Sequence, residues 1–169
     1  MLALVLLGLA AVWIIGGRLC ARVHRASEPP KDLAVETISF PSASGATLRG
    51  WFAGSPADRG VIVLLHGVRG SRLDMVERAR FLRAAGYGVL LFDFQGHGES
   101  SGEHITFGHL EGRDAAAAVK FAKRRLPGKP VGIIGGSLGG AAALRELLSQ
   151  QLRVPVALDN DVNCAAWGE

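Results

Sequence analysis

The sequence predicts an α/β fold in which a mostly parallel β-sheet is flanked by helices. Apolar runs of strand length, such as residues 61–67 (VIVLLHG) and 87–93 (YGVLLFD), alternate along the chain with stretches of helical periodicity. Polar residues and glycines follow these runs, and in parallel sheets the carboxyl ends of the strands form the functional edge. We expect the sheet to be incomplete at its C-terminal side and to be preceded by a hydrophobic helix.

The composition is that of one globular domain with an added apolar segment. Of the 169 residues, 49% are hydrophobic and 20% are charged. The formal net charge is +4, but the basic residues are scattered and aromatic residues make up 7%, so no nucleic-acid partner is expected. Cys20 and Cys164 lie far apart and lack the spacing of a zinc site or a disulfide framework. We expect neither a metal nor a cofactor.

The first 25 residues are predicted to form a membrane anchor. Residues 1–17 carry no charged side chain, and Arg18, Arg22 and Arg25 follow them. As a helix this apolar run is about 25 Å long, close to the ~30 Å hydrocarbon core of a bilayer, and the arginines can extend to the interface. A cleaved signal peptide carries its positive charge before the apolar run. We therefore favour an uncleaved anchor with the domain on the cytoplasmic side, and secretion is the alternative.

After a linker over residues 26–36, which contains prolines and charges, the α/β core is predicted to extend over residues 37–152. Alternating apolar and polar residues around a turn at residues 42–45 predict an antiparallel strand pair at the entry to the sheet. Continuous apolar runs then predict buried strands, and the stretches between them predict helices. The expected strands cover residues 35–40, 46–53, 61–67, 87–93 and a run that begins at Val131, and the expected helices cover residues 74–85 and 111–125.

The stretch GIIGGSLGGAAAL, residues 132–144, combines a strand end, a glycine-rich turn and a helix start around Ser137. Gly135, Ser137 and Gly139 form the pattern G-x-S-x-G. On a strand–turn–helix this pattern is a nucleophile elbow, which exposes the serine hydroxyl above the sheet edge and points helical N–H groups at an anion beside it. The alternative is a glycine-rich turn in which the serine only caps a helix.

Three motifs in this order resemble those of the α/β-hydrolase superfamily, in particular its serine aminopeptidase-like, lipase-like and dienelactone hydrolase-like branches. The resemblance covers about residues 37–144, and its motifs are VIVLLHGVRGSRLDM, YGVLLFDFQGHGESSGE and the elbow. It implies a serine hydrolase that acts on a small molecule with an ester, thioester or peptide bond through an acyl-serine intermediate.

The resemblance also implies the roles of individual residues. Ser137 is the nucleophile, and the backbone N–H groups of Val68 and Leu138 form the oxyanion hole. The residues that support the two motifs are His66, Gly67, Gly135 and Gly139.

The sequence contains no identifiable general base. In α/β-hydrolases the order along the chain is serine, acid and histidine, yet no histidine follows Ser137. His66 and His97 lie at positions that are structural in the family, although a rearranged loop could bring His97 to the serine hydroxyl. We therefore expect weak or no turnover. Two functions compete: an incomplete serine hydrolase and a non-catalytic, truncated or fused hydrolase-fold protein.

The tail, residues 153–169 (RVPVALDNDVNCAAWGE), resembles a short piece of the ROK family of sugar kinases. In that family the aspartate of an Asn-Asp pair is the general base, and the resemblance assigns this role to Asp161. The nucleotide-binding glycine-rich loop and the Cys/His zinc motif of such kinases are absent from the sequence, so no sugar-kinase activity is expected. The alternative is that VPVALD is the sixth strand of the hydrolase sheet, with Asp159 at its end.

Overall fold

The computed structural model describes residues 1–136 and the short segment 156–159. Within them, six strands form one sheet in the order β2-β3-β5-β4-β7-β8, and a second, two-stranded sheet pairs β1 (Val23–His24) with β6 (His97–Gly98). The strands of the large sheet are β2 (Glu36–Pro41), β3 (Thr47–Ala53), β4 (Val61–Leu65), β5 (Gly88–Phe92), β7 (Val131–Gly136) and β8 (Val156–Asp159).

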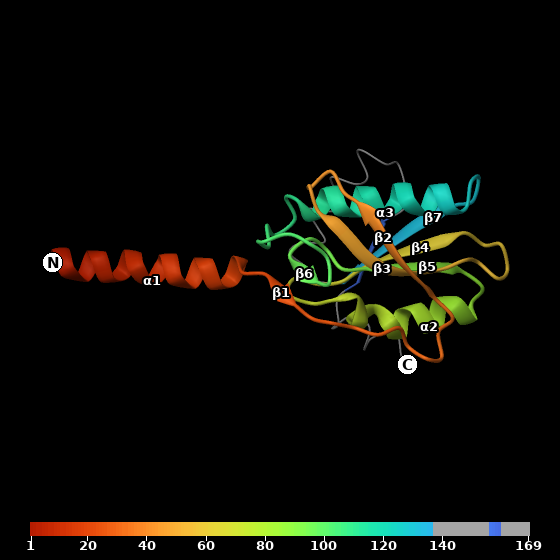
Figure 1. Cartoon of the computed structure of the whole chain (residues 1–169), viewed down its shortest axis with the longest axis horizontal. Helices are drawn as coiled ribbons and strands as arrows, with labels where there is room; N and C mark the ends of the chain where they lie inside the picture. Colours follow the sequence, from red (N-terminus) through yellow and green to blue (C-terminus); the bar gives the residue numbers. More distant parts are fainter. Residues whose placement is uncertain (137–155, 160–169) are drawn as a thin grey trace.

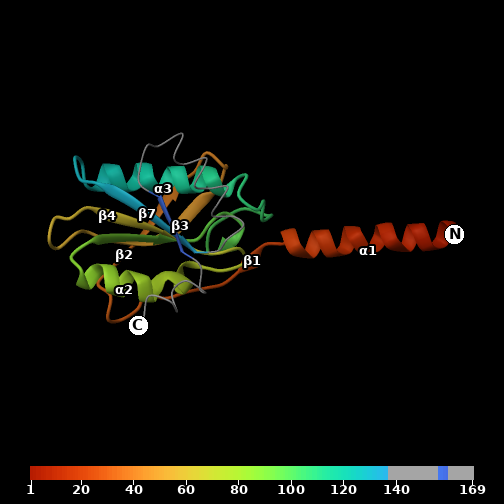
Figure 2. The same cartoon turned by 180° about the vertical axis from the view of Figure 1, so that it is seen from behind.

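Two helices cover the two faces of the large sheet (Figures 1 and 2). α3 (Glu111–Arg125) lies on one face, and α2 (Val76–Ala84), preceded by the 3-10 turn η1 (Arg72–Met75), lies on the other. α1 (Leu2–Cys20) projects away from the domain and meets it at its C-terminal end (Figure 1). The described residues therefore form a three-layer α/β domain with one projecting helix.

The directions of the strands bring four strand ends to one edge of the sheet. β2 and β3 form an antiparallel hairpin, and β3 is antiparallel to β5. β5, β4, β7 and β8 are parallel to one another, with β4 between β5 and β7. We call the edge at which these four strands end, at Leu65, Phe92, Gly136 and Asp159, the carboxyl edge.

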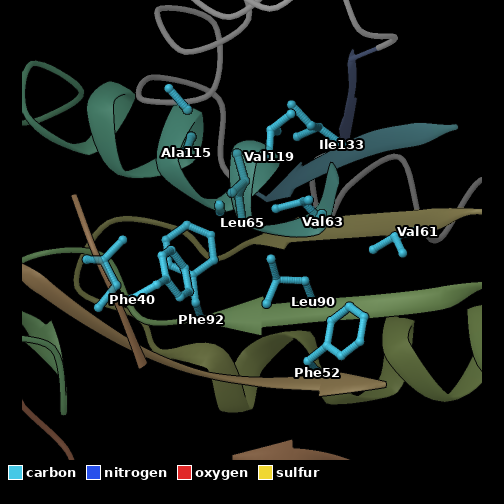
Figure 3. Close-up of a cluster of buried hydrophobic side chains, with 14 of the residues drawn as sticks. Phe40, Phe52, Val61, Val63, Leu65, Leu90, Phe92, Ala115, Val119 and Ile133 are labelled. Carbon is cyan, nitrogen blue, oxygen red and sulfur yellow. The ribbon is translucent and has the colours of Figure 1, made fainter. Parts of the chain in front are cut away.

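Alternate residues of the parallel strands point to opposite faces of the sheet and form two apolar layers. Val63 of β4 and Phe92 of β5 belong to the layer under α3, where small residues such as Ala115 allow the helix to approach the sheet closely (Figure 3). The adjacent residues Leu64 and Leu91 belong to the layer under α2. Because both faces of these strands are covered, they are apolar along their whole length, which is the pattern that the sequence shows.

The structure confirms the predicted fold class and the predicted helices. The helix predicted for residues 111–125 is α3, with the same bounds. The helix predicted for residues 74–85 begins two residues earlier, as the 3-10 turn η1, and ends at Ala84. β1 and β6 are not predicted by the sequence, because strands of two residues have no periodicity. They join the segment after α1 to the domain.

The described part of the tail is β8, which pairs in parallel with β7 so that Asp159 lies opposite Gly136. β8 has the position that the sequence analysis leaves open for a sixth strand of the sheet. Asp161 lies outside the described residues, and its kinase-like role stays a prediction.

Phe92→Ala is expected to lower the free energy of unfolding by about 3–5 kcal/mol, because the ring is fully buried and packs against Phe40 and Phe94. The matched control is Phe81→Ala on α2, where the residue is 73% exposed and the expected change is within about 0.5 kcal/mol. Urea unfolding of the full chain in detergent, followed by near-UV circular dichroism, measures both values. Equal losses in the two variants would contradict the core described above.

Candidate active site

His66 connects the loop after β4 to the loop after β5. Its ring is buried at the carboxyl edge. Nε2 accepts a hydrogen bond from the Phe94 backbone N–H at 3.1 Å, which assigns the ring proton to Nδ1, and Nδ1 donates to the Gly67 carbonyl oxygen at 2.8 Å. Backbone groups therefore engage both ring nitrogens of His66.

His97 makes a similar connection from the opposite loop. Its ring is buried, its Nε2 accepts a hydrogen bond from the Arg69 backbone N–H at 3.1 Å, and its Nδ1 donates to the Gln95 carbonyl oxygen at 2.9 Å. The rings of His66 and His97 are adjacent, with their centroids 5.0 Å apart. For His97 to act as a general base through Nε2, its hydrogen bond with the Arg69 N–H on the other loop would have to break.

A buried ion pair joins the same two loops. The side chains of Arg72 and Asp93 are no more than 1% exposed, and Arg72 Nη1 donates to Asp93 Oδ2 at 2.7 Å. Asp93 also accepts the backbone N–H groups of Arg72 and Glu99, at 2.7 and 3.0 Å. The Arg72 guanidinium bonds to the Glu99 carboxylate as well and lies over the Trp51 ring, 4.5 Å from its centroid.

Gly98, at φ +50°, leaves room for this arrangement, because a Cβ there would overlap the Asp93 carboxylate.

The pairing of β4 with β7 brings the start of the His66 loop beside Gly135, the first residue of the G-x-S-x-G pattern. Leu65, the last residue of β4, pairs with Gly135 of β7. The loop that begins at His66 therefore starts beside the end of β7 at Gly136. Val68, the third residue of this loop, is 40% exposed. The carboxyl edge thus carries an accessible loop next to the strand that ends in the glycine pair.

The structure describes some of the predicted site residues and not others. Those that it describes lie at the ends of β4 and β7 and are His66, Gly67, Val68 and Gly135. Those that lie outside the described residues are Ser137, Leu138 and Gly139. Within residues 1–136 and 156–159, no group of three or more His, Cys, Asp or Glu residues could hold a metal ion.

A family model described as serine aminopeptidase, S33, matches residues 56–158, which is more than half of the chain. The chain belongs to this α/β-hydrolase family.

Solved structures and curated proteins similar to this α/β-hydrolase include esterases and lipases. The esterase Pf2001 of Pyrococcus furiosus has a TM-score of 0.70 and 31% sequence identity, over 80% of this chain and 54% of that one. The uncharacterized protein YfhR of Escherichia coli is 29% identical over 122 residues, which are 68% of this chain and 42% of YfhR. Human monoglyceride lipase is 33% identical over 88 residues, 51% of this chain and 29% of the lipase. The chain spans about two fifths of the length of the first curated relatives that it matches.

A second buried network holds the loop between β6 and α3 of the hydrolase. Glu111 accepts hydrogen bonds from the backbone N–H groups of Thr106 and Gly108, both at 2.8 Å, and from the Thr106 hydroxyl at 2.6 Å. Burial alone would raise the pKa of Glu111, but these hydrogen bonds hold it below its ordinary value. Asp114, one turn further along α3, accepts the Gln95 backbone N–H at 2.9 Å. The start of α3 therefore anchors the loops on this side of the carboxyl edge.

Sequence reasoning misses the role of Arg72. Arginine side chains are mostly exposed, and the stretch GVRGSRLDM contains nothing that marks one of its two arginines as buried. Asp93 does carry a signal, since a carboxylate that directly follows a buried strand needs partners. The partner itself becomes identifiable only from the fold.

Burial lowers the pKa of His66 from its ordinary value of 6.5 to about 4, although the hydrogen bond to Gly67 acts in the opposite direction. The ring is therefore neutral near pH 7, and a neutral ring is what the acceptor role of Nε2 requires.

The stability of the hydrolase is expected to fall as the pH decreases from about 6.5 to about 4, because His66 takes up a proton in the unfolded chain and not in the folded one. His66 alone should account for a loss of about 3 kcal/mol over this range. In His66→Gln the free energy of unfolding should be lower at pH 7 and should depend less on pH. The control, His109→Gln, replaces an exposed histidine and keeps the parent slope. Urea unfolding at several pH values would contradict the assignment if both variants had the same slope.

Proposed function

We propose that this chain is a serine hydrolase for carboxylic esters that acts through an acyl intermediate on Ser137 and that is incomplete or weakly active over residues 1–169. The pairing of Leu65 with Gly135 supports the proposal most directly, because it starts the His66–Gly67–Val68 loop beside the strand that leads into the G-x-S-x-G pattern. Esters are favoured because the similar proteins include an esterase and a monoglyceride lipase. Thioesters and peptides share the acyl-serine chemistry and are the other substrate classes.

In the proposed reaction Ser137 Oγ attacks the carbonyl carbon of the ester while a base takes the hydroxyl proton. The backbone N–H groups of Val68 and Leu138 donate hydrogen bonds to the oxyanion that forms. Collapse of the tetrahedral intermediate breaks the bond to the leaving alcohol, which receives the proton from the base, and leaves an acyl-serine. Water then attacks the acyl-serine by the reverse sequence of proton transfers and releases the carboxylic acid.

The base in this reaction is not one of the buried histidines. The ring nitrogens of His66 and His97 are occupied by Phe94, Gly67, Arg69 and Gln95, and no histidine follows Ser137 in the sequence. We therefore propose that residues 1–169 alone have little or no turnover, although His97 binds the loop that carries the proposed oxyanion-hole residue Val68. The same observation supports a second function, in which a non-catalytic hydrolase-fold protein binds acyl ligands or a partner.

Labelling with a fluorophosphonate probe tests the nucleophile. The full chain is expected to react slowly and Ser137→Ala not at all, while the control Ser101→Ala, at an exposed serine, labels like the parent. The kcat for hydrolysis of p-nitrophenyl butyrate should be about 10⁴ to 10⁶ times lower than that of a hydrolase with a complete triad. Undiminished labelling of Ser137→Ala would refute the assigned nucleophile. Fast turnover that disappears in Ser137→Ala and in one His→Ala variant would refute the low-turnover proposal and identify the base.

We further propose that α1 is an uncleaved membrane anchor that leaves the domain on the cytoplasmic side. Among the described residues one helix, over Ala3–Cys20, is long and apolar enough to cross a membrane, with a mean hydropathy of 2.1. A signal sequence would pass the same test. Arg18, Arg22 and Arg25 follow the apolar run instead of preceding it, and this arrangement favours an anchor with its C-terminal end in the cytoplasm.

Alkaline carbonate extraction of membranes from expressing cells tests the anchor. The full chain is expected to stay in the membrane pellet, and Leu9→Arg should shift it toward the supernatant, because a charge near the centre of the span costs about 2.5–3.5 kcal/mol. Recovery of the parent chain in the supernatant, or a mature protein that lacks residues 1–20, would contradict the proposed anchor. The latter result would favour secretion.

A further inference from the structure

The C-terminal end of α1 is held against the loops of the carboxyl edge by backbone hydrogen bonds. The Ile105 N–H donates to the carbonyl oxygen of Cys20, the last residue of α1, at 2.7 Å. The Val23 N–H donates to the Gly96 carbonyl oxygen at 2.9 Å, and β1 pairs in parallel with β6. The chain therefore makes direct contact with the domain as soon as the helix ends.

Arg69 adds a side-chain connection between α1 and the loop that carries Val68. Its Nη1 donates to the carbonyl oxygens of Arg18 and Leu19, at 3.1 and 3.3 Å, in the last turn of the helix. Carbonyl groups at a helix C-terminus have no intrahelical partners and lie at the negative end of the helix dipole. A guanidinium supplies both hydrogen-bond donors and a positive charge at this position. The Arg69 backbone N–H is bound to His97 at the same time. A single residue thus links the helix to both loops of the candidate site.

Two further arginines join the segment after α1 to the same edge. Arg22 Nη2 donates to the Ser100 carbonyl oxygen at 3.3 Å, and Arg25 forms an ion pair with Asp74 at 3.7 Å. Both side chains remain exposed, as does Arg18. The direction of α1 relative to the domain is therefore set by several contacts on different loops and not by a single flexible joint.

The surface around this junction is suited to a membrane interface. Three apolar residues of this region are exposed: Leu19 (51%), which follows Arg18, Val68 (40%), which precedes Arg69, and Phe107 (49%), two residues after the Ile105 that bonds to the end of α1. Basic side chains beside apolar and aromatic ones are the combination found where proteins rest on anionic lipid headgroups. Of the acidic residues exposed at this edge, Asp74 and Glu99 are paired with Arg25 and Arg72, and Glu103 is also exposed.

We propose that the carboxyl edge rests on the membrane surface, so that the candidate site opens toward the bilayer and takes a membrane-resident ester as its substrate. The inference rests on the proposed function of α1 as an anchor. It adds that the anchor is docked in a defined orientation, which places Val68 and Phe107 in the lipid headgroup region. The opposite edge, where the loop before β4 and the end of α2 lie, then faces the aqueous phase (Figures 1 and 2).

Site-directed fluorescence quenching in vesicles tests this orientation. The full chain, with Cys20→Ala and Cys164→Ala, receives single labelling sites at the two edges: Phe107→Cys and Glu103→Cys at the carboxyl edge, Phe81→Cys and Asp58→Cys toward the opposite edge. Each member of the first pair has a matched exposed phenylalanine or acidic residue in the second. The vesicles contain phosphatidylcholine, phosphatidylglycerol and a lipid with a nitroxide on its headgroup.

The proposal expects labels at positions 107 and 103 to be quenched about twofold or more relative to labels at positions 81 and 58, because nitroxides act over the short depth of the interface. Arg69→Met should reduce this difference, whereas Arg59→Met should leave it unchanged. Arg59 is a matched control, since its Nη1 also donates to a carbonyl at a helix end, that of Ala85 at 3.1 Å, but at the opposite edge.

The possible results distinguish a failure of the proposed orientation from a failure of the proposed anchor. Chains that float with the vesicles and show equal quenching at all four positions would overturn the docked orientation and leave α1 as a flexible tether. Chains that do not float with the vesicles would overturn the anchor itself, and the orientation with it. Quenching confined to positions 107 and 103, and weakened by Arg69→Met alone, supports the proposal.

Discussion

Arg72 and Asp93 form an ion pair whose side chains are no more than 1% exposed, and four segments of the chain meet at it. Arg72 begins η1 and so directs the path into α2, while Asp93 directly follows β5. Glu99 and the Ser27 carbonyl oxygen complete the set, the latter at 3.3 Å from Arg72 Nη2. Removing two charges from water costs several kcal/mol per ion, which is recovered only when attraction and hydrogen bonds are both well formed. Loss of either partner leaves an uncompensated buried charge, at a cost of about 3–5 kcal/mol, so the pair allows little freedom to the loops that it joins.

The two histidines next to this pair show how buried imidazole rings can hold the loops of a candidate site in place. Each ring accepts one backbone N–H and donates to one backbone carbonyl, which uses its hydrogen-bonding capacity in the neutral state. His97 holds Arg69, the residue after Val68, and so restrains the amide proposed for the oxyanion hole. An oxyanion hole is effective because its donors are already oriented before charge develops. Histidine rings placed in this way organise the loop, and the proton transfer in the proposed reaction requires a different group.

The sequence predicts the regular elements of the fold well because their periodicities reflect burial. Strands covered on both faces give continuous apolar runs, and the alanine-rich stretch from Glu111 to Arg125 is predicted with the bounds that α3 has in the structure. Contacts between loops produce no comparable pattern in the sequence. No local pattern indicates that Arg72 is buried, that His97 binds the amide of Arg69, or that β1 pairs with β6, because each depends on how distant segments are brought together. The assignments of Ser137 and Leu138 still depend on the motif alone, and the pairing of Leu65 with Gly135 supplies the part that geometry contributes.

Arg69 shows why the helix and the site loop are best understood as one unit. Its φ of +62° is in the left-handed region, which costs a residue other than glycine on the order of 1 kcal/mol. Glycine would relieve that strain, but it would lose the guanidinium contacts to Arg18 and Leu19. In the observed conformation the backbone N–H reaches His97 while the side chain reaches the end of α1. Three hydrogen bonds, two of them charge-assisted, offset the local strain. The conformation of the loop that carries Val68 is therefore coupled to the position of the last turn of α1, and a force that reorients the helix acts directly on the loop of the candidate site.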